Sequence, residues 1–303
     1  MRFLRYLVDS RGWLTKTQKL PVKLICLIND TVGAMIASAY NDPNTIIGAI
    51  FGTGCNAAYM EDCGSIPKLS AKLPKDLPMA INCEYGAFDN SHQSLPRTPY
   101  DETIDKESPR PGEQTFEKMS AGLYLGEIAR LVLVDLHKKG MVFKDQDVSK
   151  LQESYIIDTA FLSSIEDDES SKLRDTAKEF QSILNIALTE PELELLRRLA
   201  ELIAVRGARL CACGIAAICK KKDISKGHVA ADGSVANKHP KFKKRWAQAL
   251  GEILDWETKS EAEQPILLTS AEDGSGVGAA VIAAMTLERS KKGQMEGIRK
   301  GML

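Results

Sequence analysis

Residues 22–42 read VKLICLINDTVGAMIASAYND, and this stretch decides the fold class of the chain. Residues 22–28 are apolar except for one lysine, which is typical of a strand covered on both faces of a sheet. The small apolar residues 34–39 then predict a helix. Asp30 falls at the junction, and ligands of open α/β sheets bind beyond such strand ends. We therefore expect an α/β fold in which Asp30 is either a catalytic carboxylate or a helix cap, and this segment alone leaves both open.

The composition is that of an ordinary soluble globular protein with one or two domains. The chain has 303 residues, of which 44% are hydrophobic and 27% charged. Its 40 Lys and Arg residues nearly balance its 41 Asp and Glu residues, so no global field attracts nucleic acid or a membrane surface. No apolar run approaches the length of a membrane span, so we expect a small ligand and neither nucleic acid nor membrane as partner.

The cysteines and the first residues favour the cytoplasm. The seven cysteines are an odd number, and only Cys211 and Cys213 are close together, with a spacing that fits neither zinc knuckles nor redox pairs. They are typical of reduced thiols. Residues 1–13 contain three arginines and an aspartate but no continuous apolar segment, so we do not expect secretion.

Hydrophobic periodicity predicts the other elements of the fold. The turn signal at 41–44 separates the first helix from the next strand. Further predicted strands are 46–51, 56–60, 80–83 and 266–268, with the first two forming a hairpin. Predicted helices are two long ones over 114–139 and 190–205 and further ones over 208–219, 242–254 and 279–285.

Two glycine-rich segments are candidate phosphate-binding loops, because backbone N–H groups without side chains can approach phosphates closely. The first is residues 52–54, Gly-Thr-Gly, and the second is residues 274–278, Gly-Ser-Gly-Val-Gly. The second fits a loose dinucleotide-binding pattern, but no βαβ unit can follow it, which argues against a Rossmann dehydrogenase. Either segment could equally be a tight turn with close helix packing.

Three carboxylates and one amide are candidates for binding a polyol. Ionised carboxylates such as Asp30, Glu84 and Glu117 accept hydrogen bonds from vicinal hydroxyls, and the amide of Asn56 both donates and accepts. The helix N-terminus would keep Glu117 ionised, which is also its simple structural explanation. The four histidines show no ligand spacing, so we predict no protein metal site.

Longer strings resemble the hexokinase family, and most closely its fungal glucokinase branch. They include LINDTVGAMIASAYNDP at 27–43, IGAIFGTGCNAAYMED at 47–62, INCEYGAFDN at 81–90 and PGEQTFEKMSAGLYLGEIARLVL at 111–133. The segments DGSVANKHPKF at 232–242 and AEDGSGVGAAVIAAM at 271–285 extend the likeness. The resemblance runs from about residue 21 to about residue 288, nearly the whole chain.

This resemblance implies the actin-like, ribonuclease H-like ATPase fold, in which two α/β lobes enclose a cleft. Residues 21–303 would form the large lobe, and residues 1–20 an atypical N-terminal segment. The implied reaction is ATP-dependent phosphorylation of glucose or a related hexose at its 6-hydroxyl, the first step of glycolysis. Phosphoryl transfer depends mainly on positioning and charge stabilisation, and Mg²⁺ would bind mainly through ATP phosphates.

The resemblance also implies roles for individual residues. Asp30 would be the general base. The sugar hydroxyls would be bound by Asn29, Asn56, Glu84 and Glu117. Nucleotide contacts would come from Gly52, Thr53, Gly54, Gly122, Thr159, Asp232, Gly233, Ser234, Gly274, Ser275 and Gly276.

One departure from the family bears on activity. The family's first phosphate loop, an Asp-Leu-Gly-Gly-Thr-Asn-like string, is absent, as are its Ser-Phe-Pro segment and the context of its Thr-Lys pair, of which only the dipeptide at 15–16 remains. We therefore expect a truncated or misassigned N-terminus and impaired turnover. The alternative is a catalytically silent hexokinase-like protein that binds sugar or a regulatory partner. The presence of Asp30 favours the enzyme, whereas the missing loop favours the alternative.

Overall fold

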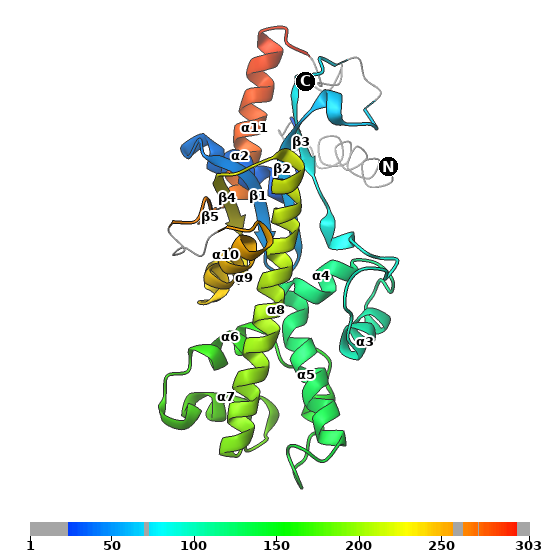
Figure 1. The fold of residues 1–303 in the computed structure, drawn as a ribbon, viewed down its shortest axis with the longest axis vertical. Coiled ribbons are helices and arrows are strands. Elements are labelled where there is room, and N and C mark those ends of the chain that lie inside the picture. Colours follow the sequence, from blue (N-terminus) through cyan, green and yellow to red (C-terminus); the bar gives the residue numbers. More distant parts are fainter. Residues whose placement is uncertain (1–23, 70–72, 257–262, 272, 296–303) are drawn as a thin grey trace, which may run out of the picture.

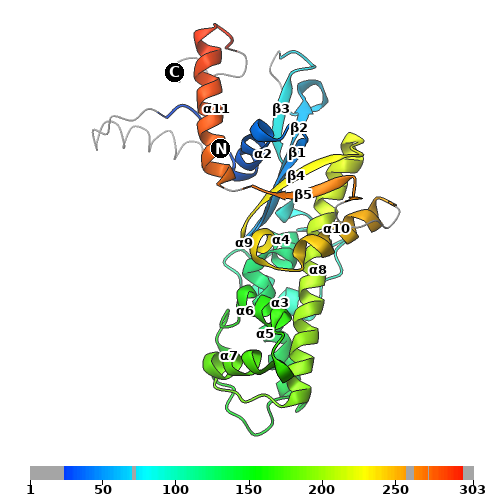
Figure 2. The same ribbon diagram turned by 90° about the vertical axis from the view of Figure 1, so that its left-hand side faces the viewer.

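The computed structural model describes residues 24–69, 73–256, 263–271 and 273–295. Within these residues, a five-stranded mixed sheet has the order β3-β2-β1-β4-β5 (Figures 1 and 2). The strands are β1 (Thr45–Phe51), β2 (Cys55–Asp62), β3 (Pro78–Asn82), β4 (Gly227–Asp232) and β5 (Ile266–Ser270). β1, β2 and β3 pair antiparallel, whereas β4 runs parallel to β1 and β5 parallel to β4. The predicted α/β class is confirmed.

Helices cover both faces of the sheet. Helices α2 (Asp30–Asn41) and α11 (Gly274–Lys291) pack together on one face, and α8 (Glu190–Lys222) and α10 (Phe242–Ile253) pack together on the other (Figure 2). The contact of α2 with β1 is very close at Gly48, where a Cβ atom would lie 2.3 Å from the carbonyl oxygen of Thr31. Only glycine therefore allows α2 to lie this close to the sheet.

A helical body extends from one end of the sheet (Figure 1). It consists of α3 (Pro99–Glu107), α4 (Thr115–Ser120), α5 (Gly122–Lys138), α6 (Thr159–Asp167), α7 (Arg174–Leu184) and the N-terminal half of α8. The short helix α9 (Ser234–Lys238) follows β4 directly. One continuous hydrophobic core includes Phe51 of the sheet, Leu133 of α5 and Trp246 of α10, so the sheet and the helical body share a single core.

The hairpin of β1 and β2 and the strands β3 and β5 confirm the predictions for those segments. The strand predicted over residues 22–28 is not found in the described part, residues 24–28, and residues 22–23 lie outside it. A strand exists only where a neighbour completes its hydrogen bonds, and no described strand pairs with this segment. The helix predicted after it does begin at Asp30.

Two predicted helix boundaries are wrong for tertiary reasons. The single helix over 114–139 breaks at Ala121, which has ψ 150°, because the N–H of Gly122 donates to the carbonyl oxygen of Gly52 at 2.8 Å. Conversely, the two helices predicted over 190–219 are one helix, α8. The guanidinium of Arg206 binds both carboxylate oxygens of Asp101, at 2.9 and 2.8 Å, and anchors the middle of α8 to α3.

Of the helices in the described ranges, only α8 is long and apolar enough to cross a membrane by length and composition, contrary to the prediction that no run has that length. In the structure, 56% of its most apolar window is buried inside the protein. The core helix of a soluble protein has the same composition, so this feature is only weak support for a membrane span.

Candidate functional site

Asn29 and Asp30 lie at the N-terminus of α2. Asn29 is the N-cap: its Oδ1 accepts hydrogen bonds from the backbone N–H of Thr31, at 3.0 Å, and from the Thr31 hydroxyl. Asp30 is exposed, and its Oδ1 accepts from the same N–H at 2.8 Å. Because Asn29 already caps the helix, Asp30 is free to present its second carboxylate oxygen to a ligand.

A network of amides and a carboxylate continues from Thr31 across the ends of β2 and β3. The Thr31 hydroxyl donates to Asn82 Oδ1 at 3.4 Å, and Asn56 Nδ2 donates to the same oxygen at 2.7 Å. Asn82 Nδ2 donates to Glu84 Oε1 at 2.7 Å. Asn29, Asn56 and Glu84, which the sequence predicted as one site, are thus connected through Thr31 and Asn82.

The sheet register explains this arrangement. Ala58 of β2 is opposite Asn82 of β3, so Asn56 and Asn82 project from the same face of the sheet, the face that α2 covers. Asn56 Oδ1 also accepts from the backbone N–H of Glu84 at 2.9 Å, and Glu84 adopts a left-handed conformation with φ 51°. Such a conformation is unfavourable for a non-glycine residue and persists where its surroundings hold it.

Glu117, on α4, reaches the same region from the helical body. Its Oε2 accepts from the backbone N–H of Cys55 at 3.1 Å, and a Cβ atom on Gly54 would lie 2.7 Å from that oxygen. Burial raises the pKa of the Glu117 carboxyl; the hydrogen bond from Cys55 opposes this, and the charge of Glu84 adds to it. That the helix N-terminus keeps Glu117 ionised stays a prediction.

The Gly-Thr-Gly segment forms the turn between β1 and β2. Gly52 N–H donates to Gly54 O at 3.1 Å, and Gly52 O accepts from Gly122 N–H at 2.8 Å. Gly233, with φ 111°, lies against the same turn, where a Cβ atom would approach within 2.8 Å of Gly52 N. Three predicted nucleotide-site glycines thus meet through their backbones, and side chains at these positions would separate the three segments.

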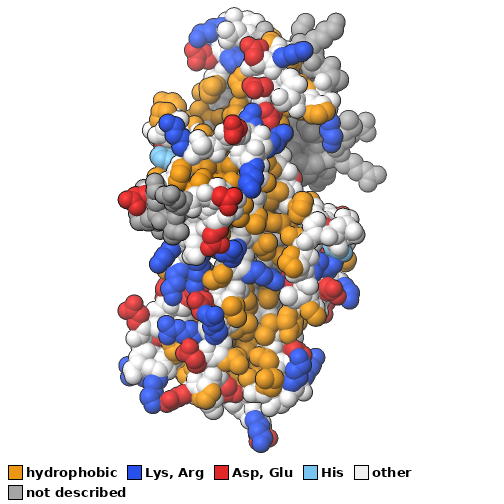
Figure 3. All heavy atoms as spheres, viewed as in Figure 1, with side chains coloured by type: hydrophobic (Ala, Val, Ile, Leu, Met, Phe, Trp, Pro, Cys, Tyr) orange, Lys and Arg blue, Asp and Glu red, His pale blue; other side chains and the backbone are white. Residues whose placement is uncertain are grey.

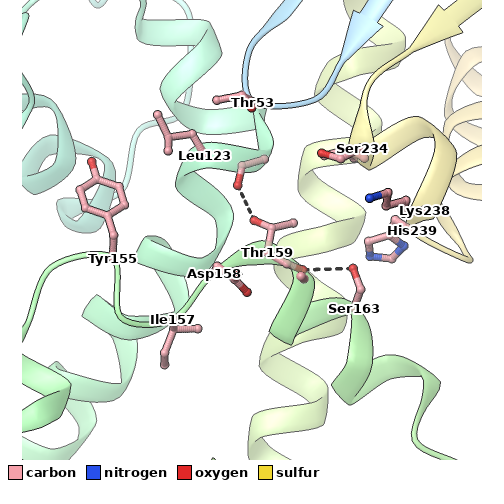
Figure 4. Close-up of a pocket in the computed structure, with 13 residues that line it drawn as sticks. Thr53, Leu123, Tyr155, Ile157, Asp158, Thr159, Ser163, Ser234, Lys238 and His239 are labelled. Carbon is pink, nitrogen blue, oxygen red and sulfur yellow. Dashed lines mark hydrogen bonds between the residues drawn. The ribbon is translucent and has the colours of Figure 1, made fainter. Parts of the chain in front are cut away.

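A pocket of about 520 Å³ opens beside this turn (Figure 4). Four predicted residues line it: Thr53, Gly122, Thr159 and Ser234. The Thr159 hydroxyl donates to Gly122 O at 2.5 Å, which connects the start of α6 to the start of α5. The volume lies within the range of about 300–1,000 Å³ for small-molecule sites.

The pocket also has walls that the sequence did not predict. Leu123, Tyr155 and Ile157 give it an apolar side, while Lys238 and His239 lie opposite, beyond Ser234 (Figure 4). The only sequence signal for Lys238 and His239 is that they follow the Asp-Gly-Ser-Val segment after two intervening residues. Tyr155 and Ile157 have no such signal.

Behind the pocket, His239 contacts a buried ion cluster centred on Glu166. Glu166 Oε1 accepts from Arg245 at 3.0 Å and lies 3.4 Å from His239 Nε2, and Lys241 Nζ donates to the Glu166 carbonyl oxygen at 2.9 Å. Burial alone would raise the pKa of Glu166, but its contact with His239 and its hydrogen bonds from Arg245 lower it to about 2. This carboxylate therefore stays ionised and holds one wall of the pocket.

Several predicted nucleotide residues lie elsewhere. Asp232 accepts the Gly233 N–H at 2.6 Å and is a turn residue at the end of β4, outside the pocket lining. Residues 274–276 form the first turn of α11 rather than a loop and do not line the pocket either. There, a Cβ atom on Gly274 would lie 2.8 Å from Ala34 Cα, so this glycine allows close packing of α11 on α2.

The described residues contain no group of three or more His, Cys, Asp or Glu side chains placed to hold a metal ion. All seven cysteines lie in the described ranges and are free thiols.

The architecture has close counterparts among solved structures. A structure described as hexokinase from Schistosoma mansoni complexed with glucose superimposes with a TM-score of 0.80 at 32% identity, over 89% of this chain and 60% of that one. A second hexokinase crystal structure superimposes with a TM-score of 0.75 at 27% identity. The fold is that of the actin-like sugar-kinase ATPases, as the resemblance implied.

The family follows from the sequence comparisons. The hexokinase family model matches residues 46–285, and the chain belongs to this family. A hexokinase of Emericella nidulans is 60% identical over 94% of this chain and 58% of its own length, and hexokinase-2 of Saccharomyces cerevisiae is 53% identical over 93% and 59%. The chain thus spans less than two thirds of the length of these relatives.

Proposed function

We propose that the chain supplies the large lobe of an ATP-dependent kinase that phosphorylates glucose or a related hexose at its 6-hydroxyl. One observation carries the proposal: the turn at residues 52–54 separates two sites of different chemistry. On one side lie the carboxylates and amides around Glu84 and Glu117, and on the other lies the pocket lined by Thr53 and Ser234. A reaction that joins a polyol to a phosphate donor needs this adjacency.

The sugar side suits hydroxyl groups. Amide and carboxylate oxygens of Asn29, Asn56, Glu84 and Glu117 would accept hydrogen bonds from the hydroxyl groups, and the amide nitrogens would donate hydrogen bonds to them. Asp30 would accept the proton of the 6-hydroxyl as that oxygen attacks the γ-phosphorus and the bond to the β–γ bridging oxygen breaks, releasing ADP. A weakly basic carboxylate suffices, because the transition state is loose and proton removal is late.

The nucleotide side suits ATP. The backbone of residues 52–54 would approach its phosphates, and the hydroxyls of Thr159 and Ser234 and the apolar wall at Ile157 would contact the nucleoside. We expect Mg²⁺ to be held by the phosphates and water, since the described residues offer no ligand cluster of their own. Bound Mg²⁺ neutralises phosphate charge.

The test is glucose-dependent ADP formation in a coupled assay, run beside calorimetry of glucose and ATP binding. It compares the 303-residue chain, the same chain fused to the N-terminal part of a fungal hexokinase, and the fused protein carrying Asp30→Asn. We expect turnover in the fused protein and its loss in the variant. Glucose binding without turnover in the fused protein would support the catalytically silent alternative, and binding of neither ligand would refute the proposal.

The free thiols support a cytoplasmic location, which localisation of a tagged chain would test.

A further inference from the structure

A second cavity, of about 460 Å³, lies on the face of the sheet opposite α2, between the C-terminal half of α8, the strands β2 and β3, and η3 (Tyr85–Ala87). Figure 3 shows a band of hydrophobic side chains along this side of the molecule. The side chains that line the cavity are mainly apolar, among them Tyr59, Ile81, Phe88 and Ile218. The volume again falls within the range of small-molecule sites, about 300–1,000 Å³.

Apart from Lys221, the lining is uncharged and rich in aromatic rings. The ring of Phe116 makes edge-to-face contacts with Tyr85, at 5.4 Å between centroids, and with Phe88, at 6.3 Å. Phe88 is 52% exposed, which is unusual for a phenylalanine and leaves its ring open to a ligand. Burial raises the pKa of the Cys83 thiol to about 11, so this cysteine is neutral at pH 7 and behaves as an apolar group.

One cation stands at the mouth of the cavity. Lys221 lines it, with its side chain 57% exposed and its Nζ 3.8 Å from Glu61 Oε2. Lys222 already pairs with Glu61 Oε1 at 2.6 Å, so one carboxylate faces two ammonium groups. Asp62, the next acidic residue, projects from the other face of β2. The mouth therefore attracts an anion.

The walls of the cavity are also the supports of the proposed sugar site. Cys83 and Tyr85 line the cavity and flank Glu84 in sequence, and Phe116 lines it and precedes Glu117. Tyr85 cannot move toward α8, because its ring already lies against Gly214, where a Cβ atom would approach within 2.7 Å. A ligand that contacts Tyr85 and Phe116 therefore acts on side chains adjacent in sequence to both glutamates.

We propose that this cavity binds a small molecule with a flat apolar body and a single carboxylate, and that its binding changes the affinity of the sugar site. The body would lie against the rings of Tyr85, Phe88 and Phe116, and the carboxylate would pair with Lys221. The effect on sugar rests on the proposed function, whereas binding to the cavity does not. Such coupling is reciprocal, because it is a free energy shared by two sites.

Calorimetry with 2-naphthoate, and with its uncharged analogue 2-naphthamide, tests the proposal on the 303-residue chain. We expect naphthoate to bind about fivefold more tightly than naphthamide, the scale of an exposed ion pair. Lys221→Gln should remove that preference, whereas Lys220→Gln, at an exposed neighbour outside the lining, should keep it. Ala217→Phe, which fills the cavity from an exposed position on α8, should weaken both ligands at least about tenfold, and Ala217→Ser should not.

The coupling is measured as the change in glucose affinity at saturating naphthoate. A change that Ala217→Phe abolishes supports it, and an unchanged glucose affinity refutes the coupling while leaving the cavity as a binding site. Failure of naphthoate to bind, or binding that Ala217→Phe does not weaken, refutes the site itself. Failure of glucose to bind under any condition would instead count against the proposed function, because naphthoate binding is measured without sugar.

Discussion

Replacing Glu166 with glutamine should lower the free energy of unfolding by about 3–4 kcal/mol at pH 7. The side chain is only 2% exposed, and Arg245, Lys241 and His239 surround it. Its pKa of about 2 lies about 2.5 below the ordinary value of 4.5, and each unit corresponds to about 1.4 kcal/mol. Glutamine keeps much of the shape and some of the hydrogen bonds, so the loss reports mainly the missing charge.

The pH dependence follows from the direction of this shift. The folded-state pKa is lower than the unfolded one, so the stabilisation is complete above about pH 4.5 and is lost as the pH falls toward 2. The difference between the original protein and Glu166→Gln should shrink over the same interval, because the original glutamate becomes protonated there. Neither the magnitude nor the window depends on catalytic activity.

Urea unfolding at pH 7, 4.5 and 3, followed by tryptophan fluorescence, measures both quantities. Glu288→Gln is the matched control, because Glu288 pairs with Lys292 on the surface with its side chain 65% exposed, and such pairs contribute little. An equal effect of the two substitutions at pH 7, or a Glu166 effect that does not change with pH, would refute the assignment of Glu166 as a buried ionised anchor.

Four further predictions concern the two sites. Asp30→Ala in the fused protein should lower turnover at least about 100-fold while glucose binding stays measurable, and near-normal turnover would remove Asp30 as the base. Glu84→Gln or Glu117→Gln should weaken glucose binding by about 1–3 kcal/mol in calorimetry, whereas Glu113→Gln, an exposed control, should not. Gly122→Ala should weaken ATP binding at least about tenfold in calorimetry, because a Cβ atom there would lie 2.9 Å from the carbonyl oxygen of the glycine turn; unchanged affinity would show that the segments can separate without cost. The 303-residue chain alone should turn over glucose several orders of magnitude more slowly than the fused protein at saturating glucose and Mg-ATP, and comparable rates would show that the second lobe is dispensable.

The sequence predicted those parts of the fold that local patterns determine. Apolar runs on either side of Gly-Thr-Gly specify a hairpin, and β1 and β2 form it. The helix break at Ala121 has no local signal, because it arises from a hydrogen bond between Gly122 and Gly52, seventy residues away in the chain. The sequence also predicted two helices where α8 continues through Gly207. Packing against neighbouring elements, and not helix propensity alone, stabilises α8 there.

The residues of the candidate site were likewise predictable where local sequence position decides their role, and not where long-range contacts do. Carboxylates at strand and helix ends could be found from their sequence positions, and the structure connects Asn29, Asn56 and Glu84 in one network. Asn82 was missed because its role depends on the register of β3 against β2, and a shift of one residue would turn it to the other face. His239 was missed because it meets Glu166 only through the packing of α6 beside the segment that follows α9.

The turn at residues 52–54 gives the two proposed sites a common support, and its two glycines act on different sides. Gly52 is held between the backbones of Gly122 and Gly233, which belong to the nucleotide side. Gly54 lies against the carboxylate of Glu117, whose hydrogen-bond donor is the next residue of the turn, Cys55. Since neither glycine has a side chain that could adjust, a shift of the turn on one side must reach the other through three residues of backbone. The geometry of the proposed sugar site and that of the proposed phosphate site therefore depend on the same short segment.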